Sequence, residues 1–204
     1  INFSESANET VVAEMAKMLD LNYVFFPGAK NGRGHFPGSI LTTYEIISSE
    51  NRPFLNKSRN GPKELFTRHW GKAKLRLPNG KTVTVHSAHL WPFTKEKSDT
   101  QVRFNEIKEL VASIKYDLAH NSDSVLLQGD LNHTPNSPEY KILKVAGLMD
   151  AFAAKGRGDG NTANSMKPST RIDYIYAIGG LSKRIQNCTP LFQGNFRLNL
   201  EDPK

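Results

Sequence analysis

The strongest constraint on the fold is residues 72–86, where apolar and polar side chains alternate and the pattern reverses at Asn79-Gly80. Before the reversal, apolar residues occupy every second position between lysine and arginine. After it, residues 82–85 return as Thr-Val-Thr-Val. Asn-Gly between two alternating runs is a strong hairpin signal, because both residues tolerate a positive φ. The segment therefore predicts an antiparallel hairpin, which excludes a purely parallel sheet.

The rest of the chain mixes helical and strand periodicities. Recurrence of apolar residues every three or four positions predicts helices at 7–20, 102–118 and 137–145. Short apolar or β-branched runs predict strands at 22–26, 39–47 (a strand or bent hairpin), 125–128, 172–178 and 185–192. Gly-rich segments at 29–37 and 155–169 favour loops. Because strands and helices do not alternate strictly, the pattern favours an α+β arrangement with a mixed, mainly antiparallel sheet flanked by helices.

Composition limits the classes of protein. The chain has 204 residues and is 38% hydrophobic, enough for one domain with a sizeable core. No apolar run approaches the roughly 20 residues of a membrane-spanning helix. The single cysteine, Cys188, excludes an internal disulfide framework and a cysteine-built metal site. Lys and Arg exceed Asp and Glu by 27 to 20, and the resulting charge of +7 favours polyanionic partners such as nucleic acid.

A basic run in the first half of the chain has two interpretations. Its cations are interleaved with Phe54, Phe66 and Trp70, so they are arranged to follow a phosphate backbone, with Lys57 and Arg59 as candidate phosphate contacts. The alternative is a solvated loop whose aromatic side chains pack inward. The cations are Arg52, Lys57, Arg59, Lys63, Arg68, Lys72, Lys74 and Arg76.

Three further segments end a strand-like run in polar side chains able to carry chemistry. They are residues 83–90, with His86 and His89, residues 125–132, with Asp130 and Asn132, and residues 171–176, with Arg171 and Asp173. Each has an ordinary structural interpretation: a capped histidine, an Asp-x-Asn turn and an Arg-x-Asp ion pair. Their combination and order are more specific than any one of them.

Together these segments resemble the endonuclease/exonuclease/phosphatase superfamily, the deoxyribonuclease I-like enzymes. The match rests on His-Leu at 89–90, Gly-Asp-x-Asn at 129–132 and Arg-Ile-Asp-Tyr at 171–174. Residues 39–44 are similar to a further strand of the family. The resemblance covers nearly the whole chain. It implies one domain over 1–204 with a four-layer α/β sandwich, in which helices flank two facing sheets.

The resemblance also implies a role for each residue. Asp130 would position or deprotonate the attacking water, and Asn132 would donate to a phosphate oxygen. His89 would contact the phosphate, with His86 a weaker candidate, and Asp173 would orient a catalytic histidine. The cofactor would be Mg²⁺ or Mn²⁺, with Asp130 and Asn132 as ligands and with water and phosphate as further ligands. Arg171, together with the basic run, is a candidate phosphate contact.

Two motifs of the family are missing from the sequence. The first helix begins close to Ile1, so we expect no strand before it, and no Gln-Glu pair precedes it. No Asp-His pair follows the last predicted strand. We therefore expect a domain truncated at both ends, with the principal metal-binding glutamate encoded at or very near the position before Ile1. We expect the Asp-His pair within roughly twenty residues after Lys204. The 204-residue chain itself should be weakly active or inactive.

The sequence thus predicts a divalent-metal-dependent phosphoester hydrolase, a monomer in which water attacks the phosphorus in line. Its charge favours a phosphodiester of nucleic acid, and hence a nuclease or other phosphodiesterase. Two alternatives stay open: a phosphatase or phosphodiesterase acting on phospholipids or on inositol or sugar phosphates, and a non-catalytic binding module with the same fold.

Overall fold

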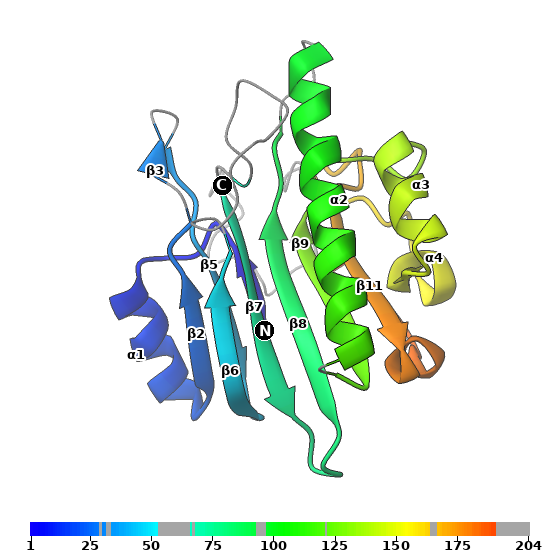
Figure 1. Cartoon of the computed structure of the whole chain (residues 1–204). Coiled ribbons are helices and arrows are strands. Elements are labelled where there is room, and N and C mark those ends of the chain that lie inside the picture. The colour runs from blue at the N-terminus through cyan, green and yellow to red at the C-terminus, as the bar shows by residue number, and fades with distance from the viewer. Residues whose placement is uncertain are drawn as a thin grey trace.

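The protein is described from a computed structural model that covers residues 1–28, 30–31, 34–52, 66, 68–92, 97–120, 122–163 and 167–190. Figure 1 labels its helices and strands. In chain order they are β1 (Asn2–Ser4), α1 (Glu9–Leu19), β2 (Asn22–Phe26), β3 (Lys30–Asn31), β4 (Gly34–His35), β5 (Gly38–Thr42), β6 (Glu45–Asn51), β7 (His69–Arg76), β8 (Thr82–His89), α2 (Lys97–His120), β9 (Ser124–Asp130), α3 (Pro138–Val145), β10 (Met149–Asp150), α4 (Ala151–Lys155), β11 (Asp173–Gly179) and the 3₁₀ helix η1 (Gly180–Arg184).

Two sheets face each other, and helices lie on the outer side of each (Figure 1). The smaller sheet has the order β1-β5-β2, and the larger has the order β10-β11-β9-β8-β7-β6. Among the described strands, β8 and β9 form the one parallel pair. Helix α1 packs on the smaller sheet, and α2 and α3 pack on the larger. The predicted four-layer sandwich of mixed, mainly antiparallel sheets is confirmed.

The hairpin that the sequence predicts is the β7–β8 pair. Its register runs from Arg76 opposite Thr82 to His69 opposite His89. The Leu77 amide donates to the Lys81 carbonyl across the turn, and Gly80 has a φ of 78°. A Cβ on Gly80 would meet no atom within 4 Å, so the backbone conformation, not space, favours glycine there.

The alternation along β7 and β8 sorts their side chains into two cores. Ala73 and Val85 face the smaller sheet and pack with its Phe26 in the core between the sheets. Trp70 and Ala88 face the opposite way and join the core beneath α2. Burial of both faces identifies β7 and β8 as central strands of the molecule.

Helix α2 fixes the chain where β8 ends. Its fully buried Glu106 accepts hydrogen bonds from the backbone amides of Phe66 (3.0 Å) and Trp91 (2.8 Å). Burial raises the pKa of Glu106 to about 7. Arg103 of the same helix donates to the Trp91 carbonyl and to Glu139 of α3. The chain that follows His89 is therefore held at both the amide and the carbonyl of Trp91.

Four sequence predictions need correction. Residues 39–47 are no single hairpin: they belong to β5 and β6, in different sheets. The segment expected to be a loop at 29–37 contains the short antiparallel pair β3–β4. Of the strand expected at 185–192, residues 185–190 contain only an isolated bridge at Cys188, and 191–192 lie outside the described residues. Helix α4, which the sequence did not predict, is capped by the Asp150 carboxylate.

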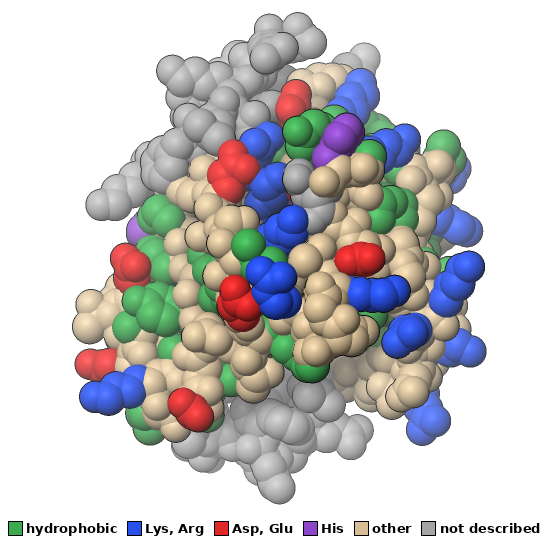
Figure 2. Space-filling model, turned by 60° about the horizontal axis from the view of Figure 1, so that its bottom comes forward, with side chains coloured by type: hydrophobic (Ala, Val, Ile, Leu, Met, Phe, Trp, Pro, Cys, Tyr) green, Lys and Arg blue, Asp and Glu red, His purple; other side chains and the backbone are tan. Residues whose placement is uncertain are grey.

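Surface charge is uneven. Figure 2 looks at the lower end of the view in Figure 1, and Lys and Arg side chains gather on its right half. That half lies on the side of α3, α4 and η1, whose exposed cations are Lys141, Lys144, Lys155, Lys183 and Arg184. No described helix is long and apolar enough to span a membrane.

Candidate active site

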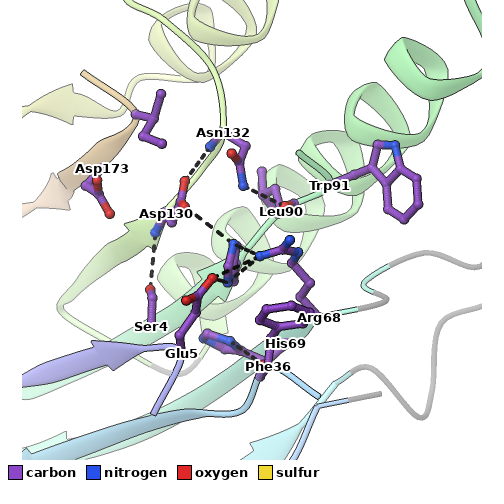
Figure 3. Close-up of polar contacts among 12 residues, drawn as sticks. Ser4, Glu5, Phe36, Arg68, His69, Leu90, Trp91, Asp130, Asn132 and Asp173 are labelled. Carbon is purple, nitrogen blue, oxygen red and sulfur yellow. Dashed lines mark hydrogen bonds and ion pairs between the residues drawn. The ribbon is translucent and has the colours of Figure 1, made fainter. Parts of the chain in front are cut away.

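Polar side chains at the ends of β8, β9 and β11 meet at one end of the two sheets (Figure 3). His89 and Asp130 are the last residues of β8 and β9, which run parallel and so end at the same edge. Asp173 is the first residue of β11 and pairs with Asp130 across the ladder. Asn132 follows two residues after Asp130. The four residues predicted from the sequence to carry chemistry are thus brought together.

Asp130 lies at the centre of this group, with Asp173 on one side and Arg68 on the other (Figure 3). Its Oδ1 accepts a hydrogen bond from the backbone amide of Asn132 at 2.9 Å, and its Oδ2 lies 3.4 Å from His89 Nε2. Burial, and then the negative charge of Asp173, raise the pKa of Asp130 to about 7. Burial likewise raises the pKa of Asp173, and the negative charge of Glu5 raises it further. The site therefore holds more negative charge than its neighbours balance.

The turn after β9 has a specific geometry. A Cβ on Gly129 (φ 133°) would lie 2.1 Å from the Ala88 carbonyl oxygen, so only glycine fits there. Asn132 has a left-handed φ of 51°, and its side-chain amide donates to the Leu90 carbonyl at 3.0 Å. The Asp-x-Asn segment is therefore both a hydrogen-bonded turn and the means by which Asp130 faces the site.

His89 is fully buried, and this burial lowers its pKa to about 2, with Arg68 as the next cause. Its ring is therefore neutral. Arg68 Nη1 lies 2.6 Å from His89 Nε2. A guanidinium can only donate, so Nε2 accepts and the ring hydrogen is on Nδ1. Nδ1 in turn lies 3.9 Å from Glu5 Oε1.

Glu5 and Arg68 are site residues to which the sequence analysis gave no such role. The expectation that no strand precedes the first helix is wrong, because β1 pairs with β5 and ends at Ser4. Glu5 follows it with a φ of 56°, and its Oε1 accepts from Arg68 Nη1 at 3.1 Å. A carboxylate thus lies within the chain where we expected one only upstream of Ile1. The sequence signal that could have identified Glu5 is an acidic residue directly after a short strand and shortly before an amphipathic helix.

Two candidate phosphate contacts from the sequence are buried and lie beside carboxylates. The guanidinium of Arg171 binds both oxygens of the buried Asp150, at 3.0 and 2.8 Å, and lies over the Tyr174 ring. This buried ion pair neutralises the charge of Arg171. His86 is likewise fully buried, and its Nε2 lies 2.9 Å from Asp117 beneath α2.

The basic run is described only in part. Lys57, Arg59 and Lys63 lie outside the described residues. Within them, Phe66 and Trp70 are fully buried, with ring centroids 4.4 Å apart, as the alternative interpretation expected. Most of the described cations of the run bind carboxylates: Arg52 binds Glu50, Lys72 binds Asp117, Arg76 binds Glu45 and Arg68 binds Glu5.

Solved structures share this architecture at low sequence identity. The catalytic domain of human Nocturnin, solved with a bound sulfate anion, matches with a TM-score of 0.67 and 12% identity over 86% of this chain and 67% of that one. Truncated TDP2 of Caenorhabditis elegans matches at 0.58 and 16%, over 88% and 70%. An endonuclease/exonuclease/phosphatase of Bacteroides vulgatus matches at 0.62 and 14%, over 86% and 71%. The chain has the fold of the endonuclease/exonuclease/phosphatase superfamily.

The resemblance seen in the sequence motifs is thus confirmed at the level of the fold. No family model matches the chain. No curated protein matches it either. The chain spans 67 to 71% of the length of the three solved structures. What this superfamily fold does in the present chain is therefore argued from its own residues.

The donor set at the site suits a hard divalent cation. Glu5, Asp130 and Asn132 offer oxygen atoms, and the negative charge of Asp173, which adds to burial in raising the pKa of Asp130, is one that a cation would offset. Within the described residues, no group of three or more His, Cys, Asp or Glu side chains is placed to hold a metal by itself. Mg²⁺ does not require one, since it binds through one or two carboxylates, water and substrate phosphate.

Proposed function

We propose that the chain is a divalent-metal-dependent phosphoester hydrolase, a phosphodiesterase for which a nucleic-acid backbone is the favoured substrate. The observation that carries this proposal is the convergence of Asp130, Asp173 and Glu5 beside the buried, neutral His89. Hydrolysis of a phosphoester needs a base for water and donors for the phosphoryl oxygens. This group of residues offers both.

Asp130 is the residue suited to take the proton from water. Its pKa of about 7 means that the carboxylate is a strong enough base to accept a proton near neutral pH. Its Oδ1 accepts a hydrogen bond from the Asn132 backbone amide, which leaves Oδ2 to face the reacting water. The turn thereby fixes the direction of the base before substrate arrives.

Two side chains are suited to stabilise the phosphoryl group. Asn132 uses one amide hydrogen on the Leu90 carbonyl and keeps a second for a phosphate oxygen. His89 carries its hydrogen on Nδ1 and stays neutral, so it acts as a hydrogen-bond donor and not as an acid. Asp173 would orient a catalytic histidine, as the family resemblance implies.

A divalent cation, Mg²⁺ or Mn²⁺, would be held by Asp130 and Asn132, with Glu5 as the principal carboxylate. When bound, it supplies Lewis-acid stabilisation of charge on the phosphoryl oxygens. Glu5 takes here the role that the sequence analysis assigned to a residue upstream of Ile1. Its side chain is 57% exposed, so a cation can reach its carboxylate from solvent.

The test is hydrolysis of four substrates by the purified chain: duplex DNA, bis(p-nitrophenyl) phosphate, sphingomyelin and an inositol polyphosphate. We expect slow release from the first two, which depends on Mg²⁺ or Mn²⁺, with a low rate if residues beyond 1–204 complete the site. Release from the lipid or inositol substrate alone would contradict the substrate class. Binding of all four without release, also with the complete gene product, would favour a non-catalytic module.

A further inference from the structure

Arg68 occupies an unusual position directly before β7. Its guanidinium lies 3.9 Å from the centre of the Phe36 ring, over its face, and its side chain is 16% exposed. Nη1 contacts both His89 and Glu5, and Figure 3 shows Glu5 beside Arg68. Within the described residues, it is the one cation that contacts this group.

The hydrogen-bonding capacity of Arg68 is only partly used. A guanidinium has five N–H donors in a rigid plane. The two hydrogens of Nη1 are directed to His89 Nε2 and Glu5 Oε1. Nε and Nη2, which carry the other three hydrogens, have no partner among the described residues. Neither atom is fully buried. One edge of the guanidinium is therefore held by hydrogen bonds within the site, while the edge formed by Nε and Nη2 has donors available for a ligand.

We propose that Arg68 binds the substrate phosphate, with Nε and Nη2 donating as a pair to two non-bridging phosphoryl oxygens. The proposal rests on the proposed function and adds to it the residue that recognises the anion. An arginine fork matches a phosphate in shape and charge, and a lysine does not reproduce this geometry. Contact with Glu5 and His89 holds the guanidinium beside the carboxylate that would activate water.

Phe36 has a supporting part in this arrangement. Its ring lies beneath the guanidinium and also meets the His89 ring edge-on, with centroids 5.9 Å apart. Stacking on an aromatic face limits the rotation of the long arginine side chain without using any of its N–H donors. Phe36 is thus a positioning residue for Arg68, and Phe36→Leu should weaken phosphate binding less than loss of the charge does.

The direct test measures binding of inorganic phosphate to the 204-residue chain by calorimetry and by the ¹⁵N shift of Arg68 Nε. Arg68→Gln should weaken binding by about 10- to 100-fold, the range for hydrogen bonds to a charged group. Arg68→Lys should recover part of the affinity through its charge. Arg76→Gln is the matched control, because Arg76 lies at the other end of β7 and its ion-pair partner among the described residues is the exposed Glu45. A melting curve of each variant verifies folding.

A parallel arm measures kcat/KM on bis(p-nitrophenyl) phosphate and on an oligonucleotide. Both should fall in Arg68→Gln and stay low in Arg68→Lys, because the fork is lost. No saturable phosphate binding by the unmodified chain, or equal affinity in Arg68→Gln, overturns the proposal. If phosphate binding depends on Arg68 while neither this chain nor the complete gene product cleaves a phosphoester, the proposed function fails and the phosphate site stands. If cleavage occurs and ignores Arg68, the reverse holds.

Discussion

Strand β8 carries two histidines, three residues apart, and each lies beside an aspartate. His86 faces α2, where its Nε2 lies 2.9 Å from Asp117 and its Nδ1 accepts from Trp70 Nε1 at 3.1 Å. Lys72 Nζ completes the group by binding both Asp117 oxygens, at 2.9 and 3.0 Å. His89 lies at the strand end, 3.4 Å from Asp130, and Asp173 adds a second negative charge there.

The two aspartates differ because their partners differ. Burial acts to raise the pKa of Asp117, but hydrogen bonds from His86 and Lys72 outweigh it and lower that pKa to about 2. Burial and Asp173 raise the pKa of Asp130 to about 7. The same two residue types therefore form a satisfied structural pair on one face and an unbalanced pair at the site. Imbalance of this kind is typical of residues kept for chemistry.

Removal of divalent cations should give the largest difference between the two His–Asp pairs, because only the site that contains His89 and Asp130 should depend on a cation. EDTA should lower hydrolysis by about a thousandfold or more, because Lewis-acid stabilisation supplies several kcal/mol. Addition of Mg²⁺ or Mn²⁺ should restore it. The His86–Asp117 pair requires no cation, since Lys72 already balances it. Full activity after exhaustive EDTA treatment and dialysis would show that the imbalance at Asp130 has another purpose.

Exchange of each aspartate for its amide compares the pairs directly. Asp130→Asn should lower kcat by about 100- to 10,000-fold, the range for loss of a general base. Asp117→Asn should leave kcat of the folded protein within about threefold, because its effect is on stability. Stopped assays on bis(p-nitrophenyl) phosphate measure both. A loss below threefold in Asp130→Asn would reduce that residue to a turn former.

Stability should respond in the opposite sense. Asp117→Ala removes the acceptor of the buried His86 and the nearer of the two carboxylates beside Lys72, and we expect a loss of about 3–5 kcal/mol, as for a broken buried pair. Asp130 has a folded pKa of about 7. Because its unfolded pKa is about 3.9, stability falls as pH rises from about 4 to 7. Asp130→Asn should therefore stabilise the chain at pH 8, on the order of 1–2 kcal/mol, and not at pH 4.

Urea unfolding at the two pH values measures these changes in the free energy of unfolding. Equal effects of Asp130→Asn at pH 4 and pH 8 would contradict the assigned pKa. For Asp117 the pH dependence has the other sign: its pKa of about 2 lies below the unfolded value, so its contribution is lost as pH falls through the acid range.

Titration of the metal-free protein tests the cause of the difference. By ¹³C NMR the Asp130 carboxyl should titrate near pH 7, and the Asp117 carboxyl near pH 2. Asp173→Asn should lower the pKa of Asp130, because it removes a negative neighbour. Mg²⁺ should lower it as well, since a ligand must be deprotonated to bind. An Asp130 pKa that ignores both changes would leave burial as its one cause.

The sequence predicted those parts of the molecule that depend on local pattern. The hairpin at Asn79-Gly80 and the three strand-end motifs depend on short spacings, which a single sequence displays. Glu5 was missed because β1 has three residues, too few for a periodic signal. The roles of Arg171 and His86 depend on partners 21 and 31 residues away, Asp150 and Asp117. Such long-range pairing leaves no local mark.

The role of Arg68 likewise could not be predicted from local sequence pattern. In the sequence it is one of eight cations in a basic run, without a feature that distinguishes it. Among the cations of the run that the structure describes, it is the one that reaches His89, while Lys72 binds Asp117 on the opposite face. A count of charges therefore suggested a polyanionic substrate, but the sheet decides which charge meets the site and which stabilises the fold.

The smallest expected effect concerns the cations of the run that neither pair uses. If Lys57, Arg59 and Lys63 contact a nucleic-acid backbone, their joint replacement by alanine should reduce the slope of log affinity against log salt by about 2–3, because each phosphate contact releases roughly one counterion. Lys141, Lys144 and Lys155, exposed on α3 and α4, form the matched triple control and should change the slope little. Affinity for a DNA duplex measured from 50 to 300 mM salt decides between them. Equal slopes for both triple variants would assign the run to the solvated surface, and recognition of the anion would then rest on the residues around Asp130.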